Sequence, residues 1–386
     1  NFNEEKIRQI ARRAKELGVE MLVLDDGWFG KRNTDNCSLG DWVVNPEKLP
    51  GGLNGLSDRL HDLGLKFGLW FEPEMISPDS DLYRAHPDWC LHVDGRARVE
   101  MRNQLILDLS RKEVQDYIIE SVSAVLESAR IEYVKWDMNR NMTEPFSGAQ
   151  TPERQKETQH RYMLGLYRVL EEITARFPEI LFESCSGGGG RFDPGMLYYM
   201  PQTWTSDDSD AAERMFIQYG TSLVYTPCAM GAHVSAVPNH QTGRTTAMQT
   251  RGDVALGGNF GFELDLSQLS DADAETVRRL IEREKQVRTL VRTGEFTRLL
   301  SPFDHPYAAW QFRARDNSEA LICAYRLMTR PATPHLLLRA SGLDESAIYM
   351  DDDGNTCSGA ALTRYGLWLH LPGDFTSKVI HLRRIG

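Results

Sequence analysis

The chain has few cysteines, and none of them lie close together in the sequence. The six are Cys37, Cys90, Cys185, Cys228, Cys323 and Cys357, without CxxC or CxxxC spacing. Zinc knuckles and small disulfide frameworks need such spacing, so neither is predicted. Free thiols in a reducing compartment are the simpler interpretation, and they favour a cytoplasmic protein.

Long apolar runs and clusters of basic residues are also missing. No stretch of about 18 apolar residues occurs, so no membrane-spanning helix is predicted. The formal net charge is -11, and an acidic protein repels phosphate backbones and anionic lipid. Neither nucleic acid nor a membrane is therefore an expected partner, whereas a neutral small molecule is.

The 386 residues are enough for one large domain and a smaller one. Up to residue 294, short apolar runs alternate with longer helical patterns, which is typical of βα units and a parallel sheet. The expected strands are residues 21–24, 66–71, 105–107, 131–136, 180–183, 203–206 and 223–225. The expected helices are residues 1–17, 53–63, 112–129, 153–177, 210–220 and 274–291.

Acidic or reactive residues follow nearly every expected strand, namely Asp25, Asp26, Glu72, Glu74, Asp108, Asp137, Cys185 and Asp207. Active sites of (β/α)8 barrels are built at these carboxyl ends, so residues 1–294 are predicted to form such a barrel. A doubly wound open sheet is the alternative, but it usually gathers ligand groups at one switch point. Seven expected strands, where a barrel needs eight, also fit a first strand that lies upstream of Asn1.

The pattern changes after residue 294. Short, partly alternating runs at residues 309–314, 320–327, 335–339, 347–350, 367–371 and 378–382 are separated by turn residues. Residues 295–386 are therefore predicted to form a small antiparallel β-sandwich domain.

The most informative segment is KWDMNR at residues 135–140. Side chains on a strand alternate between faces, so Lys135, Asp137 and Asn139 are expected to point into one cavity. Burying a charged pair inside a strand carries a large desolvation cost, so this strand end is predicted to open onto a ligand and to belong to an active site.

Asp137 and Asp207, on separate strands, form the strongest candidate pair for chemistry. In retaining glycosidases one carboxylate attacks the sugar while a second acid protonates the leaving oxygen, with roughly 5 to 5.5 Å between them. Lys135 is expected to keep Asp137 ionised, and the acidic neighbours of Asp207 to raise its pKa.

Each acidic motif has a structural alternative. Asp208 or Asp210 is suited to cap the following helix. Asp25 and Asp26 suit a simple βα turn, or they accept hydrogen bonds from vicinal sugar hydroxyls. Mg²⁺ binding by strand-end acids (Asp25, Asp26, Glu72, Glu74, Asp137) is the main competing chemistry, although the ammonium of Lys135 opposes it.

Aromatic residues near strand ends favour a carbohydrate ligand. Trp28, Trp70, Trp136 and Trp204 are candidates to pack on a pyranose, with a place in the core as the alternative for each. Arg102 is a candidate donor to a hydroxyl pair, and a salt bridge with Glu100 is its alternative.

The run SCSGGGGR at residues 184–191 permits three interpretations. A phosphate cradle lacks the required glycine spacing. A nucleophilic Cys185 needs a base, and the nearest histidine in sequence is His160, on an expected helix. The favoured interpretation is that small residues let backbone amides and the thiol approach a sugar closely.

Seven motifs in order resemble the α-galactosidases of glycoside hydrolase family 36. They are LDDGWFG (24–30), WFEPEM (70–75), KWDMNR (135–140), ESCSGGG (183–189), WTSD (204–207), IQYGTS (217–222) and MGAHVS (230–235). The resemblance covers essentially the whole chain.

The resemblance implies a retaining exo-α-galactosidase without a cofactor, with Asp137 as nucleophile and Asp207 as acid/base. It also implies a galactose subsite lined by Asp25, Asp26, Trp70, Arg102, Lys135, Asn139, Cys185, Gly188 and Trp204. The implied substrates are raffinose- or melibiose-like oligosaccharides. A galactosyl transferase that uses the same intermediate stays open, as do a silent sugar-binding barrel and a metal-dependent lyase.

Family members of this type carry a large N-terminal β-sandwich before the barrel and often form tetramers. The resemblance therefore implies that this sandwich and the first barrel strand lie upstream of Asn1, and that the full-length protein is a homo-oligomer.

Overall fold

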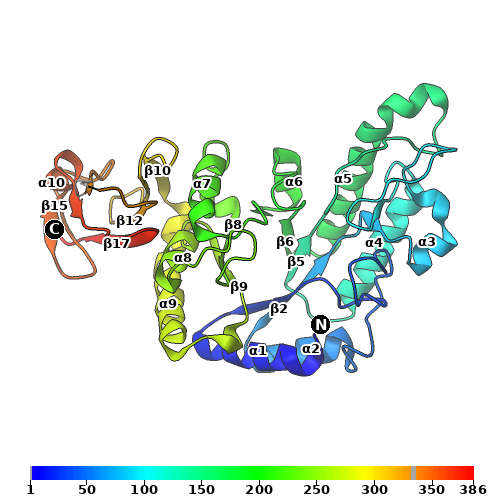
Figure 1. Ribbon diagram of the computed structural model, residues 1–386, viewed down its shortest axis with the longest axis horizontal. Coiled ribbons are helices and arrows are strands. Elements are labelled where there is room, and N and C mark those ends of the chain that lie inside the picture. The colour runs from blue at the N-terminus through cyan, green and yellow to red at the C-terminus, as the bar shows by residue number, and fades with distance from the viewer. Residues whose placement is uncertain (1, 332–335) are drawn as a thin grey trace. The chain divides into compact units, whose positions relative to one another are not determined.

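The computed structural model describes residues 2–331 and 336–386 and divides into two compact units, Asn1–Trp204 and Thr205–Gly386. Figure 1 shows the helices and strands of both units.

Parallel strands form the sheet of the first unit. They pair in the order β1 (Met21–Leu24), β2 (Lys66–Phe71), β5 (Tyr133–Trp136), β6 (Leu181–Ser184) and β7 (Gln202–Trp204). Phe71 is the register partner of Trp136, which is in turn the partner of Ser184. The carboxyl ends of β2, β5 and β6 therefore meet at one edge of the sheet.

Helices connect these strands. They are α1 (Glu4–Leu17), α2 (Gly52–Asp62), α3 (Asp81–Ala85), α4 (Lys112–Glu127), α5 (Thr158–Arg176) and α6 (Pro194–Tyr199), with 3-10 turns at Pro87–Trp89 and Pro152–Glu157. The core of the unit combines buried strand residues such as Phe67 and Val134 with helix residues such as Val122 and Leu166.

Helix α1 shows how local sequence sets the bounds of an element. Asn3 accepts a hydrogen bond from the Lys6 backbone N–H at the start of the helix. Gly18 ends it with a φ of 97°, a conformation that glycine adopts without a Cβ clash. The buried face consists of Ile7, Ala11, Ala14 and Leu17, and α1 and α2 lie side by side in Figure 1.

One expected barrel strand is wrong. Residues 105–107 do not join the parallel sheet, because β4 (Leu105–Ile106) pairs antiparallel with the short β3 (Met75–Ile76). The apolar run was correctly predicted to be extended and buried, but burial alone does not specify which strand is the partner.

The second unit begins with further βα elements. Strands β8 (Met230–Ser235) and β9 (Asn259–Glu263) are parallel. The helices are α7 (Ala211–Thr221), α8 (Met248–Ala255) and α9 (Asp271–Thr293), with 3-10 turns at Pro227–Ala229 and Leu266–Gln268. The expected strand at residues 223–225 is wrong, because these residues form the turn after α7 and Leu223 and Val224 are exposed.

An antiparallel sheet follows in the order β10 (Glu295–Leu300), β11 (Tyr307–Arg313), β12 (Glu319–Arg326), β17 (Thr376–Arg384), β14 (Ile348–Met350) and β15 (Thr356–Ser358). A second pair consists of β13 (Leu336–Leu338) and β16 (Leu367–Leu369), and α10 spans Gly359–Arg364. Each expected C-terminal strand overlaps one of these, although His335 lies outside the described residues.

The predicted fold class is confirmed: parallel βα units of the (β/α)8 barrel type precede a C-terminal antiparallel β domain. Strands β8 and β9 were not among the expected strands. In residues 2–331 and 336–386, no helix has the length and apolar character needed to cross a membrane.

Candidate active site

The Asp137 carboxylate lies directly after β5 and is buried. Its Oδ1 accepts a hydrogen bond from the Met138 backbone N–H at 2.8 Å. Its Oδ2 accepts from the Asn139 side-chain amide at 2.7 Å and from the Trp70 indole N–H at 3.1 Å. Three donors hold this carboxylate in one orientation, which is what a nucleophile or an electrostatic stabiliser requires.

Lys135 precedes Asp137 on the same face, as strand alternation predicts. Its Nζ lies 3.5 Å from Asp25 Oδ2 and 5.9 Å from the centre of the Trp204 ring. Burial by itself lowers the pKa of Lys135, but the negative charges of Asp25, Glu183 and Asp137 outweigh it and raise the pKa. Lys135 is therefore a permanent cation in the site.

Cys185 lies beside the same carboxylate, directly after β6. Burial and the charge of Asp137 raise the pKa of its thiol well above the usual value, so the thiolate needed for nucleophilic attack is disfavoured. Gly188 contributes its backbone N–H to Cys185 and its backbone oxygen to the Ser186 N–H, at 2.7 Å. A φ of 89° at Gly188 makes glycine the favoured residue there.

Arg102 reaches the site from an exposed hairpin. Its guanidinium donates to Asn139 Oδ1 at 2.8 Å, so the Asn139 amide bridges Arg102 and Asp137.

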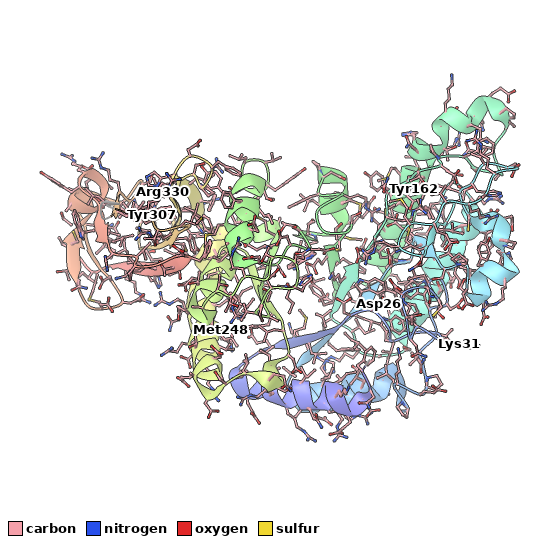
Figure 2. All side chains as sticks on the ribbon, in the orientation of Figure 1. Asp26, Lys31, Tyr162, Met248, Tyr307 and Arg330 are labelled. Carbon is pink, nitrogen blue, oxygen red and sulfur yellow. The ribbon has the colours of Figure 1, made fainter. Side chains whose placement is uncertain are left out.

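The two adjacent acids after β1 have different surroundings. Asp26, labelled in Figure 2, pairs with the buried Arg32 through Nη2 at 2.8 Å and Nε at 3.0 Å. Asp25 is exposed over 64% of its side chain and accepts from the Asp26 backbone N–H at 2.8 Å. Asp25 is thus open to a ligand, while Arg32 orients Asp26.

All four tryptophans are buried, and two of them also contact candidate site residues. Trp70 donates to Asp137, and Trp204 lies beneath Lys135. Trp28 and Trp136 are completely buried. The Trp28 indole donates to the Trp70 backbone oxygen at 2.9 Å, so Trp28 helps to fix the position of Trp70. Trp28 and Trp136 are therefore core residues, which was the alternative given for them.

Glu72 is an acid at the carboxyl end of β2 whose role sequence reasoning missed. It accepts a hydrogen bond from the Asn139 backbone N–H. Burial, reinforced by the charge of Asp137, raises its pKa to about 8. At neutral pH Glu72 therefore carries a proton, which avoids a second negative charge beside Asp137.

Glu74 is the centre of a buried cluster of hydrogen-bonded side chains. It accepts from Arg191 Nη1 and Nη2 at 2.9 and 2.8 Å, and from the Tyr162 hydroxyl at 2.6 Å. The Trp136 indole donates to it at 3.0 Å, and Figure 2 labels Tyr162, which is on α5. This cluster ties the glycine-rich segment to β5.

The strand-end acids do not assemble a metal site in the part of the chain that the structure describes. No group of three or more His, Cys, Asp or Glu side chains there is arranged to hold an ion. Asp26 and Glu74 are instead paired with arginines.

Asp207 lies in the second unit, and its residue is exposed. Its segment is held by Arg214, which donates to the Ser206 backbone oxygen at 3.2 Å. Asp210 caps α7 by accepting from the Ala212 backbone N–H at 2.9 Å, which confirms the capping alternative for that residue. Asp208 Oδ1 accepts from the Asp210 backbone N–H at 3.2 Å.

Glu263, a further acid in this unit, was not among the residues selected from the sequence. His233 on β8 lies 3.6 Å from Glu263 on β9. Burial by itself raises the pKa of Glu263, but His233, Ser209 and Arg214 outweigh it and lower the pKa. Glu263 thus stays ionised beside the segment that carries Asp207. The MGAHVS motif was the only available pointer to His233, and the strand that carries Glu263 was not predicted.

The chain is similar to known protein families and to known proteins. The melibiase family model matches residues 1–294, and the model of the glycosyl hydrolase family 36 C-terminal domain matches residues 307–382. The chain is 59% identical to alpha-galactosidase AgaA of Geobacillus stearothermophilus, over 100% of the chain and 53% of AgaA. It is 48% identical to the bifunctional alpha-galactosidase/sucrose kinase AgaSK of Mediterraneibacter gnavus, over 95% of the chain and 38% of AgaSK.

Solved structures give the same result. The crystal structure of AgaA superposes with a TM-score of 0.98 at 59% identity, covering 100% of this chain and 54% of that one. A variant of AgaA crystallised in complex with raffinose also has a TM-score of 0.98, at 58% identity and the same coverage. The chain spans about half the length of AgaA. With both family models matched in order along it, the chain belongs to the melibiases of glycoside hydrolase family 36.

Proposed function

We propose that the protein is a retaining exo-α-galactosidase that removes terminal α-galactosyl residues from melibiose- or raffinose-type oligosaccharides. One observation carries the proposal. Nine residues selected from the sequence are linked to each other and to Asp137 through hydrogen bonds, an ion pair and electrostatic interactions: Asp25, Asp26, Trp70, Arg102, Lys135, Asn139, Cys185, Gly188 and Trp204. A named relative crystallised with raffinose supports the substrate class.

In this proposal Asp137 attacks the anomeric carbon and forms a covalent galactosyl ester. Trp70 and Asn139 aim the attacking oxygen, because both donate to Asp137 Oδ2. Lys135, Asp25 and Arg102 bind sugar hydroxyls, and the face of Trp204 packs on the ring.

Asp207 is proposed as the acid that protonates the leaving oxygen and then, as a base, activates the water that cleaves the ester. Its exposed position suits a group that exchanges protons with solvent, and Arg214 fixes the backbone next to it. Retention predicts roughly 5 to 5.5 Å between the carboxyl groups of Asp137 and Asp207, whereas about 6.5 to 9.5 Å would indicate inversion.

The test is hydrolysis of an activated aryl α-galactoside, measured for the 386-residue chain and for a longer natural protein if its source encodes one. Asp137→Ala should abolish turnover, and added azide should restore it and yield the β-galactosyl azide. Asp58→Ala, at an exposed position on α2, is the matched control and should leave turnover unchanged. Full activity in Asp137→Ala would refute the assignment.

A galactosyl transferase uses the same ester and differs only in whether a sugar or water intercepts it. Product analysis at high sugar concentration distinguishes the two. A silent sugar-binding barrel would bind galactose without turnover, and a metal-dependent lyase would lose activity with EDTA.

The organisation of the whole protein belongs to the same proposal. We place the domain boundary near residue 294, where the first family match ends. A cytoplasmic location is supported by six free cysteines. A homo-oligomer, expected to be a tetramer, is testable by light scattering on the purified protein.

A further inference from the structure

The hairpin that carries Arg102 has an unfavourable turn. The Met101 N–H bonds to the Gln104 oxygen at 3.3 Å and the Gln104 N–H to the Met101 oxygen at 3.2 Å, which leaves two residues between them. These two, Arg102 and Asn103, have φ values of 52° and 58°. Positive φ at both central positions is the pattern of a type I′ turn, which favours Asn and Gly and disfavours a long side chain such as Arg. Backbone strain of this kind persists only where the surrounding structure holds it.

Little apolar packing holds this turn in place. The residues at its centre are exposed, and the neighbouring Val99 and Met101 are 43% and 37% exposed. Polar contacts with the rest of the protein must therefore hold the hairpin in this conformation.

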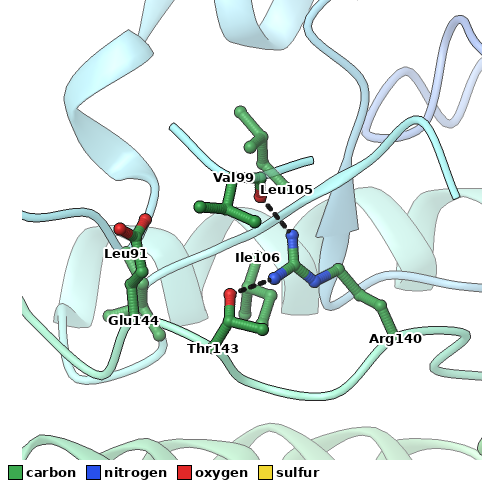
Figure 3. A pocket seen from close by; sticks show the side chains of 7 residues that line it. All are labelled: Leu91, Val99, Leu105, Ile106, Arg140, Thr143 and Glu144. Atoms are coloured by element: carbon green, nitrogen blue, oxygen red, sulfur yellow. Dashed lines mark hydrogen bonds between the residues drawn. The ribbon is translucent and has the colours of Figure 1, made fainter. Parts of the chain in front are cut away.

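Arg140 provides that anchor (Figure 3). Its Nη1 donates to the backbone oxygen of Val99 at 2.7 Å. The same Nη1 donates to the backbone oxygen of Gln104 at 2.9 Å, so the two acceptors lie on opposite sides of the turn. Its Nη2 donates to Thr143 Oγ1 at 2.7 Å, and its Nε to the Asn141 backbone oxygen at 3.2 Å. Arg140 as a whole is only 7% exposed, and it lines a small cavity together with Val99. A lysine could not form this fork.

The anchor and the site are joined at one residue. Arg140 follows Asn139 directly in the chain, and the hairpin that Arg140 holds returns Arg102 to the Asn139 side chain. Asn139 in turn donates to Asp137. A shift of the hairpin would therefore be felt at the Asp137 carboxylate.

We propose that Arg140 is a positioning residue: by clamping both sides of the Arg102 hairpin it sets the affinity of the galactose subsite. The proposal rests on the proposed function, since Arg102 must bind substrate for its position to matter.

A double-mutant cycle tests it. Michaelis constants for an aryl α-galactoside are measured for Arg140→Lys, Arg102→Ala and the double variant. Each single change should raise KM by about tenfold, because losing a hydrogen bond to a charged group weakens binding by about that factor. The KM of the double variant should be no higher than that of either single variant. An equal fold-increase from Arg140→Lys in both backgrounds would overturn the proposal, and so would an unchanged KM in Arg140→Lys. Absence of turnover in the unmodified protein would count against the proposed function instead.

A second variant leaves Arg140 intact, in case Arg140→Lys does not fold. Asn103→Val places a β-branched residue at positive φ, so the turn should open and KM should again rise by about tenfold. Asn103→Gly is the matched control, because glycine suits the turn, and its KM should stay within about twofold of the unmodified value. An unchanged KM in Asn103→Val would overturn the proposal.

Discussion

Replacing Glu72 by glutamine should make the protein more stable, by an amount that grows with pH. Glu72 is 1% exposed and its pKa is about 8, against 4.5 for an ordinary glutamate. Because the pKa of this acid is higher in the folded chain than in the unfolded one, its contribution to stability is fully present below pH 4.5. That contribution is lost as the pH rises to about 8.

The size of the effect follows from the pKa difference. Each pKa unit corresponds to about 1.4 kcal/mol. Ionisable Glu72 should therefore lower the free energy of unfolding by about 3 kcal/mol at pH 7, and by on the order of 5 kcal/mol well above pH 8. Glutamine cannot ionise, and its side-chain oxygen still accepts the hydrogen bond that Asn139 donates to Glu72.

Urea unfolding at pH 5 and pH 8, followed by tryptophan fluorescence, measures the difference. The gap in unfolding free energy between Glu72→Gln and the unmodified protein should widen by about 3 kcal/mol between these pH values. Glu47→Gln, at an exposed position, is the matched control and should show no widening. A gap of equal size at both pH values would refute the reasoning, since it would mean that Glu72 titrates alike in the folded and unfolded chains.

Three further predictions concern activity and packing. Trp70→Phe removes the indole donor to Asp137, so kcat/KM for an aryl α-galactoside should fall by about tenfold or more; unchanged kinetics would contradict the role. Gly165→Ala would place a Cβ 1.9 Å from a backbone oxygen and should lower the free energy of unfolding, measured with urea, by more than about 1 kcal/mol. Gly220→Ala meets no such clash and should raise it slightly. Asp253 is buried, and burial raises its pKa to about 6. The free energy of unfolding of Asp253→Asn, measured relative to that of the unmodified protein, should therefore rise by on the order of 1–3 kcal/mol between pH 4 and pH 7. A difference between the two proteins that stays constant over this pH range would contradict the prediction.

Local patterns predicted the centre of the site. Lys135, Asp137 and Asn139 were placed on one face by strand alternation alone, and the structure brings the Asn139 amide to 2.7 Å from the Asp137 carboxylate. Alternation is a property of the extended backbone, so it needs no knowledge of the partner strands. The same local logic correctly located strands β1, β2 and β5 and the cap at Asp210.

Patterns of burial did not identify strand partners. Residues 105–107 read as a barrel strand but pair with β3 outside the parallel sheet. The residues of β9 are only partly buried, and β8 includes three small residues and a histidine, so neither strand was predicted. Pairing depends on contacts between segments far apart in the chain, which hydrophobic periodicity does not encode.

By itself, then, the sequence determined the family, the βα repeat and the nucleophile candidate, because ordered motifs and strand alternation are local. Only the tertiary structure decided the electrostatics and support of the site. Burial beside Asp137 keeps Glu72 protonated, and Arg140 holds the strained Arg102 hairpin from below. Both effects arise from groups that folding brings together, and desolvation and hydrogen-bond geometry exist only once those groups meet.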